Sequence, residues 1–266
     1  MDRVEPETVR NAVDSARAQG TDRDVRQLLS WAYELLGERL MMSTAFGKSG
    51  MVILNEIREA APQVPVYFLD TGFHFQETLD YIDTLKKWNV NVVLKRPKLY
   101  GPEFIKAYGE KPYERDPDFC CHKNKVEPFR ELIGGPDAPY QGWITGIRRD
   151  QSSTRATAEP IELLEGNQVK IQPLAYWTRQ EVEDYIAKHD IPLHPLFSQG
   201  YASVGCAPCT ARSGDSTDER AGRWAGKAKT ECGLHTFWKK TDKAGFQPKP
   251  QEKDSSKPSS PAQAAG

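Results

Sequence analysis

The sequence has no long hydrophobic run and almost no net charge. Its 266 residues contain no apolar stretch that approaches the roughly 18 residues of a transmembrane helix. The formal net charge is −1, so the overall charge does not point to nucleic acid or an anionic membrane as a partner. The first residues, 1–20, are polar and lack the apolar core of a secretion signal. These absences predict a cytoplasmic protein with no nucleic-acid or membrane partner.

Cysteine is scarce, with five residues in the chain. Cytosolic thiols stay reduced, which argues against a disulfide framework and for metal or catalytic use. Cys120 and Cys121 are adjacent, Cys206 and Cys209 form a C-x-x-C pair, and Cys232 stands alone. Adjacent thiolates suit a single zinc ion poorly, whereas each corner of an iron–sulfur cube binds its own thiolate. The pattern favours a [4Fe–4S] cluster over zinc, with unrelated buried cysteines as the remaining alternative.

Short strand-like runs alternate with helical runs through most of the chain. Strands are predicted at 40–46, 64–69, 90–95, 143–147 and 169–174, and helices at 6–37, 51–60, 76–88 and 179–189. The last helix begins after a capping box, Thr178 to Glu181. This alternation predicts an α/β fold with a mostly parallel, twisted sheet and helices on both faces.

Composition divides the chain into four predicted parts. Residues 191–241 are rich in glycine, proline and charge, and the residues from 247 on have almost no apolar content. The predicted parts are an N-terminal helical segment (1–24), the α/β domain with the iron–sulfur site (25–212), a mobile C-terminal arm that carries Cys232 (213–241) and a disordered tail (242–266).

Three turns that follow predicted strands could bind a ligand. Residues 43–50 are mostly small or hydroxylated, and they precede a helix N-terminus, which favours an anion. They match no common phosphate-loop motif. Asp70 and Thr71 follow the second strand, where ligands of open α/β sheets bind. Residues 146–155 contain three arginines, which bind oxyanions in a forked geometry. The alternatives are an ordinary glycine-rich turn, a capping aspartate and a solvated charged loop.

Cys232 lies in a strongly basic stretch. Between residues 220 and 240 there are six basic side chains and one acid, Glu231. A positive field favours the thiolate, which is the nucleophilic form, and His235 is close enough in sequence to assist. An incidental surface cysteine is the alternative. Lys125, four residues after Cys121, would lie over that thiol if a helix begins there, and its charge would face an anionic substrate; simple solvation is the alternative.

Taken together, these motifs resemble the iron–sulfur adenylyl-sulfate (APS) reductases of the assimilatory sulfonucleotide reductase family, over roughly residues 25–240. The most specific elements are Cys120-Cys121, Cys206-Ala207-Pro208-Cys209 and Glu231-Cys232-Gly233-Leu234-His235. The segments 69–72 and 146–152 support the resemblance. It implies an adenine nucleotide alpha-hydrolase-like α/β fold.

The resemblance also implies the site residues. A [4Fe–4S] cluster would be held by Cys120, Cys121, Cys206 and Cys209, and Lys125 would bridge the cluster and the substrate. Arg220 and Arg223 match the arginines that hold the sulfate and phosphate. The segments that line the nucleotide contain Ser43, Thr44, Gly47, Leu69, Thr71, Arg148 and Gln151.

By the same resemblance, Cys232 attacks the sulfur of adenosine 5′-phosphosulfate, AMP leaves, and a Cys232 S-sulfonate forms. Thioredoxin or a glutaredoxin-like reductant then releases sulfite, a step of sulfate assimilation for cysteine biosynthesis. The 43–47 loop resembles that of the cluster-free 3′-phospho (PAPS) reductases equally well, so PAPS or dual specificity stays open. A tRNA-thiolating ATP pyrophosphatase and a zinc-stabilised binding module are further alternatives, and a homo-oligomer is left open.

Overall fold

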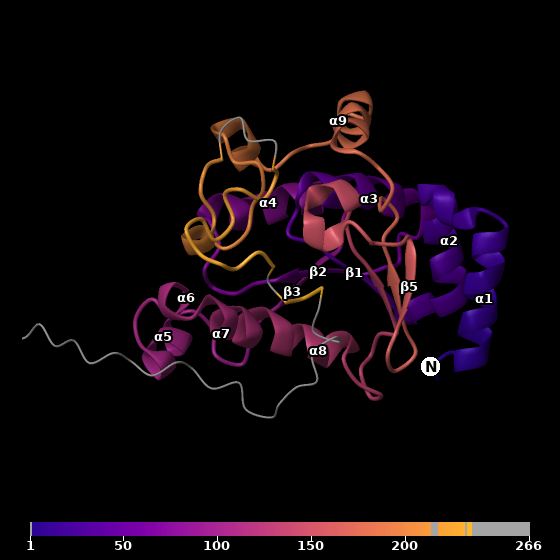
Figure 1. Ribbon diagram of the computed structural model, residues 1–266, viewed down its shortest axis with the longest axis horizontal. Coiled ribbons are helices and arrows are strands. Elements are labelled where there is room, and N and C mark those ends of the chain that lie inside the picture. Colours follow the sequence, from indigo (N-terminus) through magenta and orange to yellow (C-terminus); the bar gives the residue numbers. More distant parts are fainter. Residues whose placement is uncertain (1, 214–217, 232, 236–266) are drawn as a thin grey trace, which may run out of the picture.

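A six-stranded sheet forms the centre of the protein. The computed structural model describes residues 2–213, 218–231 and 233–235. The strand order is β3-β2-β1-β4-β6-β5 (Figure 1). All neighbouring pairs are parallel except β5 with β6. The strands are β1 (Leu40–Ser43), β2 (Val66–Leu69), β3 (Val92–Lys95), β4 (Gly142–Ile144), β5 (Ile161–Leu164) and β6 (Gln168–Ile171).

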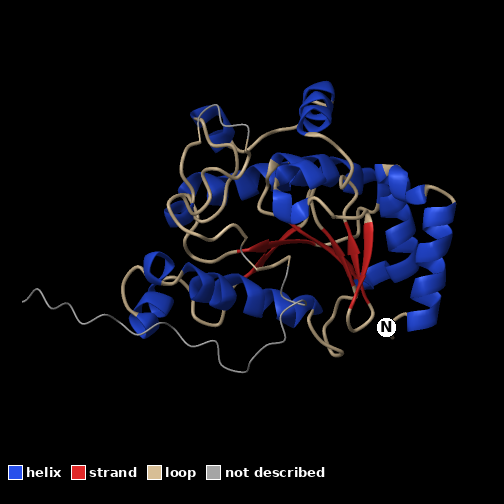
Figure 2. Ribbon diagram, in the orientation of Figure 1, coloured by secondary structure: helices blue, strands red, loops and turns tan. Residues whose placement is uncertain are grey.

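Helices cover both faces of this sheet, as the blue ribbons above and below the red strands in Figure 2 show. The helices are α1 (Pro6–Ala18), α2 (Val25–Leu36), α3 (Lys48–Ala60), α4 (Gln76–Lys87), α5 (Pro102–Tyr108), α6 (Pro112–Arg115), α7 (Pro117–Cys121), α8 (Glu127–Ile133) and α9 (Arg179–Lys188). The predicted α/β class with a mostly parallel sheet is therefore confirmed. None of the described helices is long and apolar enough to cross a membrane.

The strands place alternate side chains in two separate cores. Leu40 and Met42 of β1 point into the larger core, which contains residues of α1, α2, α3, α4 and α9. Met41, between them, points to the opposite face and packs in a smaller core with Phe129 of α8 and Trp143 of β4. Successive side chains of a strand face opposite sides, so a buried strand must be apolar on both.

The structure differs from the sequence prediction in one helix and one strand, and short-range backbone chemistry explains both differences. The helix predicted over 6–37 is two helices, since Gly20 has φ +72° and Asp24 begins α2 by accepting a hydrogen bond from the Gln27 N–H at 2.8 Å. The edge strand β5 was not predicted. It is four residues long and pairs with β6 through a turn in which Gly166 and Asn167 both have positive φ.

The predicted strand at 143–147 ends at Ile144, so the arginine-rich segment begins as a loop. A further difference concerns the segment after the tandem cysteines. Cys121 ends α7, residues His122–Val126 form a π-helical turn, and α8 follows. Pro128 explains the widening, because it has no N–H to donate and its ring would clash with the Asn124 carbonyl of a regular α-helix.

Candidate functional site

A cleft lies at the carboxyl ends of the central strands. β1 is flanked by β2 on one side and β4 on the other, so the direction of strand order reverses here. Open parallel sheets bind ligands at such a switch point. The loops after β1, β2 and β4 and the first turn of α3 line the cleft, together with residues from 202–205, 219–224 and 231–235.

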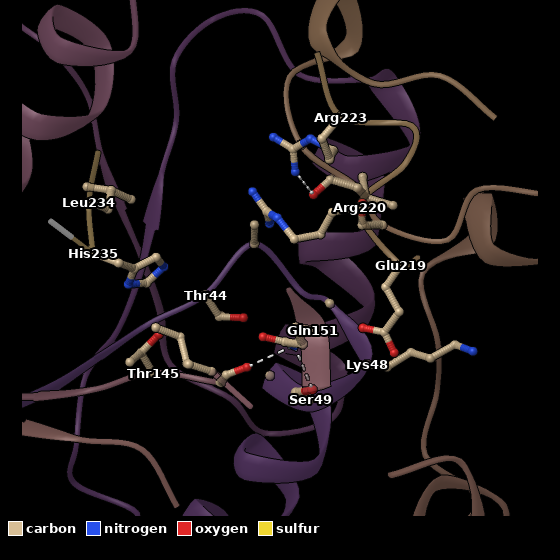
Figure 3. A pocket seen from close by; sticks show the side chains of 18 of the residues that line it. Thr44, Lys48, Ser49, Thr145, Gln151, Glu219, Arg220, Arg223, Leu234 and His235 are labelled. Carbon is tan, nitrogen blue, oxygen red and sulfur yellow. Dashed lines mark hydrogen bonds between the residues drawn. The ribbon is translucent and has the colours of Figure 1, made fainter. Parts of the chain in front are cut away.

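Most of the predicted site residues meet in this cleft. Figure 3 shows Arg220 and Arg223 on one side and His235 on the other, with Thr44 and Gln151 between them. Thr71 and Arg148 do not line the cleft. The predicted residues that line it are Ser43, Thr44, Gly47, Leu69, Lys125, Gln151, Arg220, Arg223 and His235.

The loop from β1 to α3 is built to present backbone N–H groups. The Thr44 side chain accepts a hydrogen bond from the Phe46 N–H at 2.9 Å, which holds Phe46 at φ +60°. Gly47 is the N-cap of α3 and has no capping side chain. Residues 47–50 line the cleft, so the helix N-terminus faces it. Such an N-terminus favours an anion through its unpaired N–H groups and its dipole. Lys48 lines the cleft, but its ammonium also pairs with Glu183 at 2.6 Å.

Arg148 supports the site from behind. Its side chain is 1% exposed, and its guanidinium donates to Ser49 Oγ at 2.6 Å and pairs with Asp150 and Glu219, each at 2.9 Å. Burial alone would lower the pKa of Arg148, but these two carboxylates raise it. The Arg148 guanidinium therefore stays protonated, and it holds the loop after β4 against α3. Gln151 reaches the cleft from the same loop and bonds the Gly146 carbonyl at 3.3 Å.

Arg220 and Arg223 stand over a buried tryptophan. The Trp224 ring lies 5.8 Å from the Arg220 guanidinium carbon and 4.8 Å from that of Arg223. Arg223 donates to the Val204 carbonyl at 3.2 Å and packs on Gly205. Aromatic faces attract cations, so Trp224 holds both guanidinium groups at the cleft wall.

The four clustered cysteines line a small cavity next to the cleft. Cys120 and Cys121 come from α7, and Cys206 and Cys209 from the turn that starts at the bridge between His74 and Cys206. Lys125 and Trp224 line both the cavity and the cleft, so they form the wall between them. Thr71 faces this cavity, with its hydroxyl 3.2 Å from Cys206 Sγ.

The four cysteines that line this cavity are consistent with a metal cluster. All four thiols are free, and burial together with the other three thiols raises the pKa of Cys120, while the charge of Lys125 opposes that rise. Within the described ranges, no three His, Cys, Asp or Glu side chains converge closely enough to ligate one ion. The ligands of an iron–sulfur cube stand further apart than those of one ion, because each thiolate binds a different iron.

Residues on both sides of the predicted nucleophile in the sequence line the cleft. Cys232 itself lies outside the described residues, but its flanking residues are described. Leu234 packs on the smaller core, and the His235 ring stacks on Trp143 at 5.2 Å between centroids with 2° between planes. Burial, followed by the charges of Arg155, Lys170 and Arg220, lowers the pKa of His235, which keeps its imidazole neutral.

Besides Lys48, three charged residues of the cleft were absent from the predicted site. Arg155, Glu219 and Glu231 all line it. Arg155 belongs to the arginine-rich stretch and Glu231 is the single acid of the basic run, so both carried a sequence signal. Glu219 carried none, because its role depends on its approach to Arg148, 71 residues away in the sequence.

Comparisons with known proteins agree with this geometry. The family described as phosphoadenosine phosphosulfate reductase domain matches residues 39–212. The adenosine 5′-phosphosulfate reductase of Staphylococcus haemolyticus is 42% identical over 226 residues, which are 84% of this chain and 91% of that protein.

Two solved structures are similar to this fold. The phosphoadenylyl-sulfate (PAPS) reductase from Candida auris, a phosphate complex, is 28% identical with a TM-score of 0.65, over 75% of this chain and 96% of that one. The Candida glabrata FMN adenylyltransferase with FAD and pyrophosphate has a TM-score of 0.51 at 15% identity, covering 85% of each chain, and shows a similar fold only.

Proposed function

Because the chain belongs to the phosphoadenosine phosphosulfate reductase domain family, we propose that it reduces adenosine 5′-phosphosulfate (APS) to sulfite and AMP in sulfate assimilation. The observation that carries the proposal is one cleft at the switch point that gathers arginines, a helix N-terminus and Lys125 beside four cysteines. A dianionic nucleotide anhydride fits these groups. The reduced thiols that the reaction needs suit a cytoplasmic location.

In the proposed complex, the α3 N-terminus and Arg220 and Arg223 hold the phosphosulfate. Ser43, Thr44, Gly47, Leu69 and Gln151 line the nucleotide, while Arg148 and Thr71 act from behind the cleft wall. The guanidinium groups are fixed before substrate arrives, by Trp224 beneath them. Preorganised cations of this kind stabilise charge that develops on a leaving phosphate.

The first chemical step is the attack of the Cys232 thiolate on the sulfonyl sulfur. A sulfur–sulfur bond forms, the bond between the sulfonyl sulfur and the phosphate oxygen breaks, and AMP leaves with that electron pair. The enzyme now carries a Cys232 S-sulfonate. Nucleophilic catalysis divides one difficult reduction into two easier steps. His235 lines the cleft as a neutral imidazole, but its lowered pKa makes it a weak base, so the positive charges of the cleft, rather than this ring, favour the Cys232 thiolate.

The second step needs a dithiol protein, thioredoxin or a glutaredoxin-like reductant. Its thiolate attacks Cys232 Sγ, and sulfite leaves with the electron pair of the sulfur–sulfur bond. The partner's second thiol then resolves the mixed disulfide and restores the Cys232 thiol. The two electrons gained by sulfur therefore come from the dithiol, which becomes a disulfide.

The residues that would hold a [4Fe–4S] cluster are Cys120, Cys121, Cys206 and Cys209. When bound, the cluster would supply a fixed electrostatic anchor beside the anion site. Lys125 and Trp224 separate it from the cleft, so the ammonium of Lys125 faces both the thiolates and an incoming anion. About four irons per anaerobically purified chain would support this assignment, and a colourless zinc protein would contradict it.

PAPS is the second candidate substrate, favoured by the similarity to the Candida auris enzyme. The relatives of higher identity are named as APS reductases, which supports APS. Steady-state rates on the two nucleotides, measured side by side, decide between them. Faster turnover of PAPS would overturn the choice of APS.

The central prediction concerns Cys232→Ser. We expect this variant to lose sulfite formation almost completely, because serine cannot form the S-sulfonate, while its iron content stays at the wild-type level. Sulfite release with APS and thioredoxin, and iron per chain, are measured on the same anaerobic preparation. Normal sulfite formation by the variant would exclude the proposed mechanism.

A further inference from the structure

The carboxylate of Glu231 sits in a fork of two arginines inside the cleft. Arg155 donates through Nε to Oε1 at 2.8 Å and through Nη2 to Oε2 at 3.0 Å. Arg220 adds a contact from Nη2 to Oε2 at 3.3 Å and also donates to the Thr230 carbonyl at 2.8 Å. A two-pronged arginine–carboxylate pair fixes orientation as well as charge.

This pair is shielded from solvent. The side chains of Glu231 and Arg155 are only 12% and 11% exposed. Burial alone would raise the pKa of Glu231, but the hydrogen bond and charge of Arg155, with the charge of Arg220, lower it, so the carboxylate is ionised at neutral pH. Ion pairs of this kind resist rupture more than surface pairs, because either partner alone would leave a buried charge unpaired.

The contacts on the other side of Cys232 are apolar. Gly233 lies beside Val126 with φ +87°, and Leu234 packs on the smaller core. Residues on both sides of Cys232 in the sequence are thus held in place, Glu231 by charge and residues 233–235 by packing.

We propose that Glu231 is a positioning residue: its fork with Arg155 docks Thr230 and Glu231 in the cleft, and this docking is required for transfer of the sulfonyl group to the enzyme. The proposal rests on the proposed function, since it concerns the step assigned to Cys232. In this proposal Glu231 acts through Arg155 and not on the substrate. Arg220, which contacts Glu231 at 3.3 Å, is shared between the docking and the phosphosulfate, whereas Arg223 and the α3 N-terminus are left to the nucleotide.

The test is a single turnover of the anaerobic, cluster-containing full chain with excess APS and no reductant. S-sulfonate formation is followed by intact-protein mass, and AMP affinity is measured separately. We expect Glu231→Gln to slow S-sulfonate formation about 100-fold at saturating APS, as a misplaced reacting group does. AMP affinity should change by less than about threefold, since the nucleotide contacts remain.

Two further variants separate docking from other roles. Glu231→Asp keeps the charge and should recover part of the rate lost in Glu231→Gln. If Glu231→Gln loses iron or folds poorly, Glu231→Asp is tested in its place. Arg155→Gln should be at least as slow as Glu231→Gln, because Arg155 Nη1 also donates to Gln151 Oε1 at 2.6 Å, and the double variant no slower than Arg155→Gln, because the fork can be lost only once. Glu131→Gln is the matched control: Glu131 pairs with Lys95 at 2.6 Å away from the cleft, and we expect wild-type rates.

The proposal is overturned if Glu231→Gln forms S-sulfonate at the wild-type rate, or if the effects of the two single variants multiply in the double variant. The second result would mean that Arg155 acts on the substrate alone. Cys232→Ser is run in parallel. Sulfite formation by Cys232→Ser would contradict the proposed function, whereas an inactive Cys232→Ser with a fast Glu231→Gln would contradict only the docking role.

Discussion

Gly205 lies directly under the guanidinium of Arg223. A Cβ atom at this position would come within 2.2 Å of Arg223 Nη2, far inside van der Waals contact. The guanidinium is the far end of a flexible side chain, so it would move and the backbone would not. The placement of this arginine, for which we propose a role in anion binding, is therefore decided by the absence of a methyl group on the facing loop.

Gly205→Ala should accordingly weaken binding without unfolding the protein. We expect KM for APS to rise about tenfold and kcat to fall as well, because the displaced cation both binds the substrate and stabilises the charge that develops on the leaving phosphate. Steady-state kinetics with iron content as a folding check would measure this. Gly135→Ala, where an added Cβ meets no atom within 4 Å, is the control. An unchanged KM would mean that Arg223 does not bind the substrate.

At the same scale, residue type alone did not decide which arginines face the ligand. Arg148, Arg149 and Arg155 are within one short stretch, yet Arg148 is buried behind the loop, Arg149 pairs with Glu159, and Arg155 enters the cleft. Their different positions depend on the carboxylates that pair with them, which are Glu219 for Arg148, Glu159 for Arg149 and Glu231 for Arg155. The sequence indicated an anion site here but not which guanidinium would serve it.

Among the elements, α9 begins as its capping box predicts. Thr178 Oγ1 accepts a hydrogen bond from the Glu181 N–H at 3.2 Å, and the Glu181 carboxylate accepts one from the Thr178 N–H at 2.6 Å. Such a start is encoded within four residues, and it was predictable for that reason.

Thr178→Ala should destabilise the protein through this element. Loss of the cap typically costs about 1 kcal/mol, so we expect the apparent Tm to fall by about 2–4 °C. Thermal unfolding of the anaerobic holoprotein would measure the shift. Gln180→Ala, an exposed change in the first turn, should leave Tm within about 1 °C of wild type. Equal shifts in both variants would show that the cap is not the cause.

The α7–α8 region shows the limit of element-level prediction. The sequence suggested a helix that begins at Cys121, whereas α7 ends there and a π-helical turn carries Lys125 into the wall between cavity and cleft. Pro128 removes a backbone donor, but whether the chain breaks or widens at that point depends on packing. Val126 and Phe129 packed in the smaller core favour the continuous, widened helix.

At the scale of the whole molecule, His194 joins the segment after α9 to α4. Its Nδ1 accepts a hydrogen bond from the Leu196 N–H at 3.2 Å, so Nε2 carries the proton that is donated to Thr78 Oγ1 at 2.9 Å. The ring also lies 5.2 Å from that of Tyr81. Burial lowers the pKa of His194 below its ordinary value of 6.5, although the charge of Glu77 opposes this.

This histidine should make stability depend on pH. The unfolded chain takes up the proton first as pH falls below about 6.5, so the contribution is complete above that pH and declines below it. We expect the apparent Tm to fall between about pH 7.5 and pH 5.5, and His194→Asn, which can still cap Leu196, to flatten the part of the slope due to His194. Identical slopes in both proteins would contradict this assignment.

By itself, the sequence determined the α/β class, the starts of α1, α4 and α9, the resemblance to a reductase family and the identity of the chemical groups. These are carried by short patterns: alternating apolar residues, capping residues and fixed cysteine spacings. Such patterns act over a few neighbours along the chain and can be read without coordinates. The roles of the site residues, including that of Cys232, remain predictions, which the variants described above would test.

Only the tertiary structure decided which of those groups meet. The order of strands brings the loops after β1, β2 and β4 to one edge, and the packing of α7 places its cysteines against a turn more than 80 residues further along. The fork between Arg155 and Glu231 joins residues 76 apart in the sequence. Contacts of this kind depend on the arrangement of whole elements, and a linear pattern of residue types does not specify it.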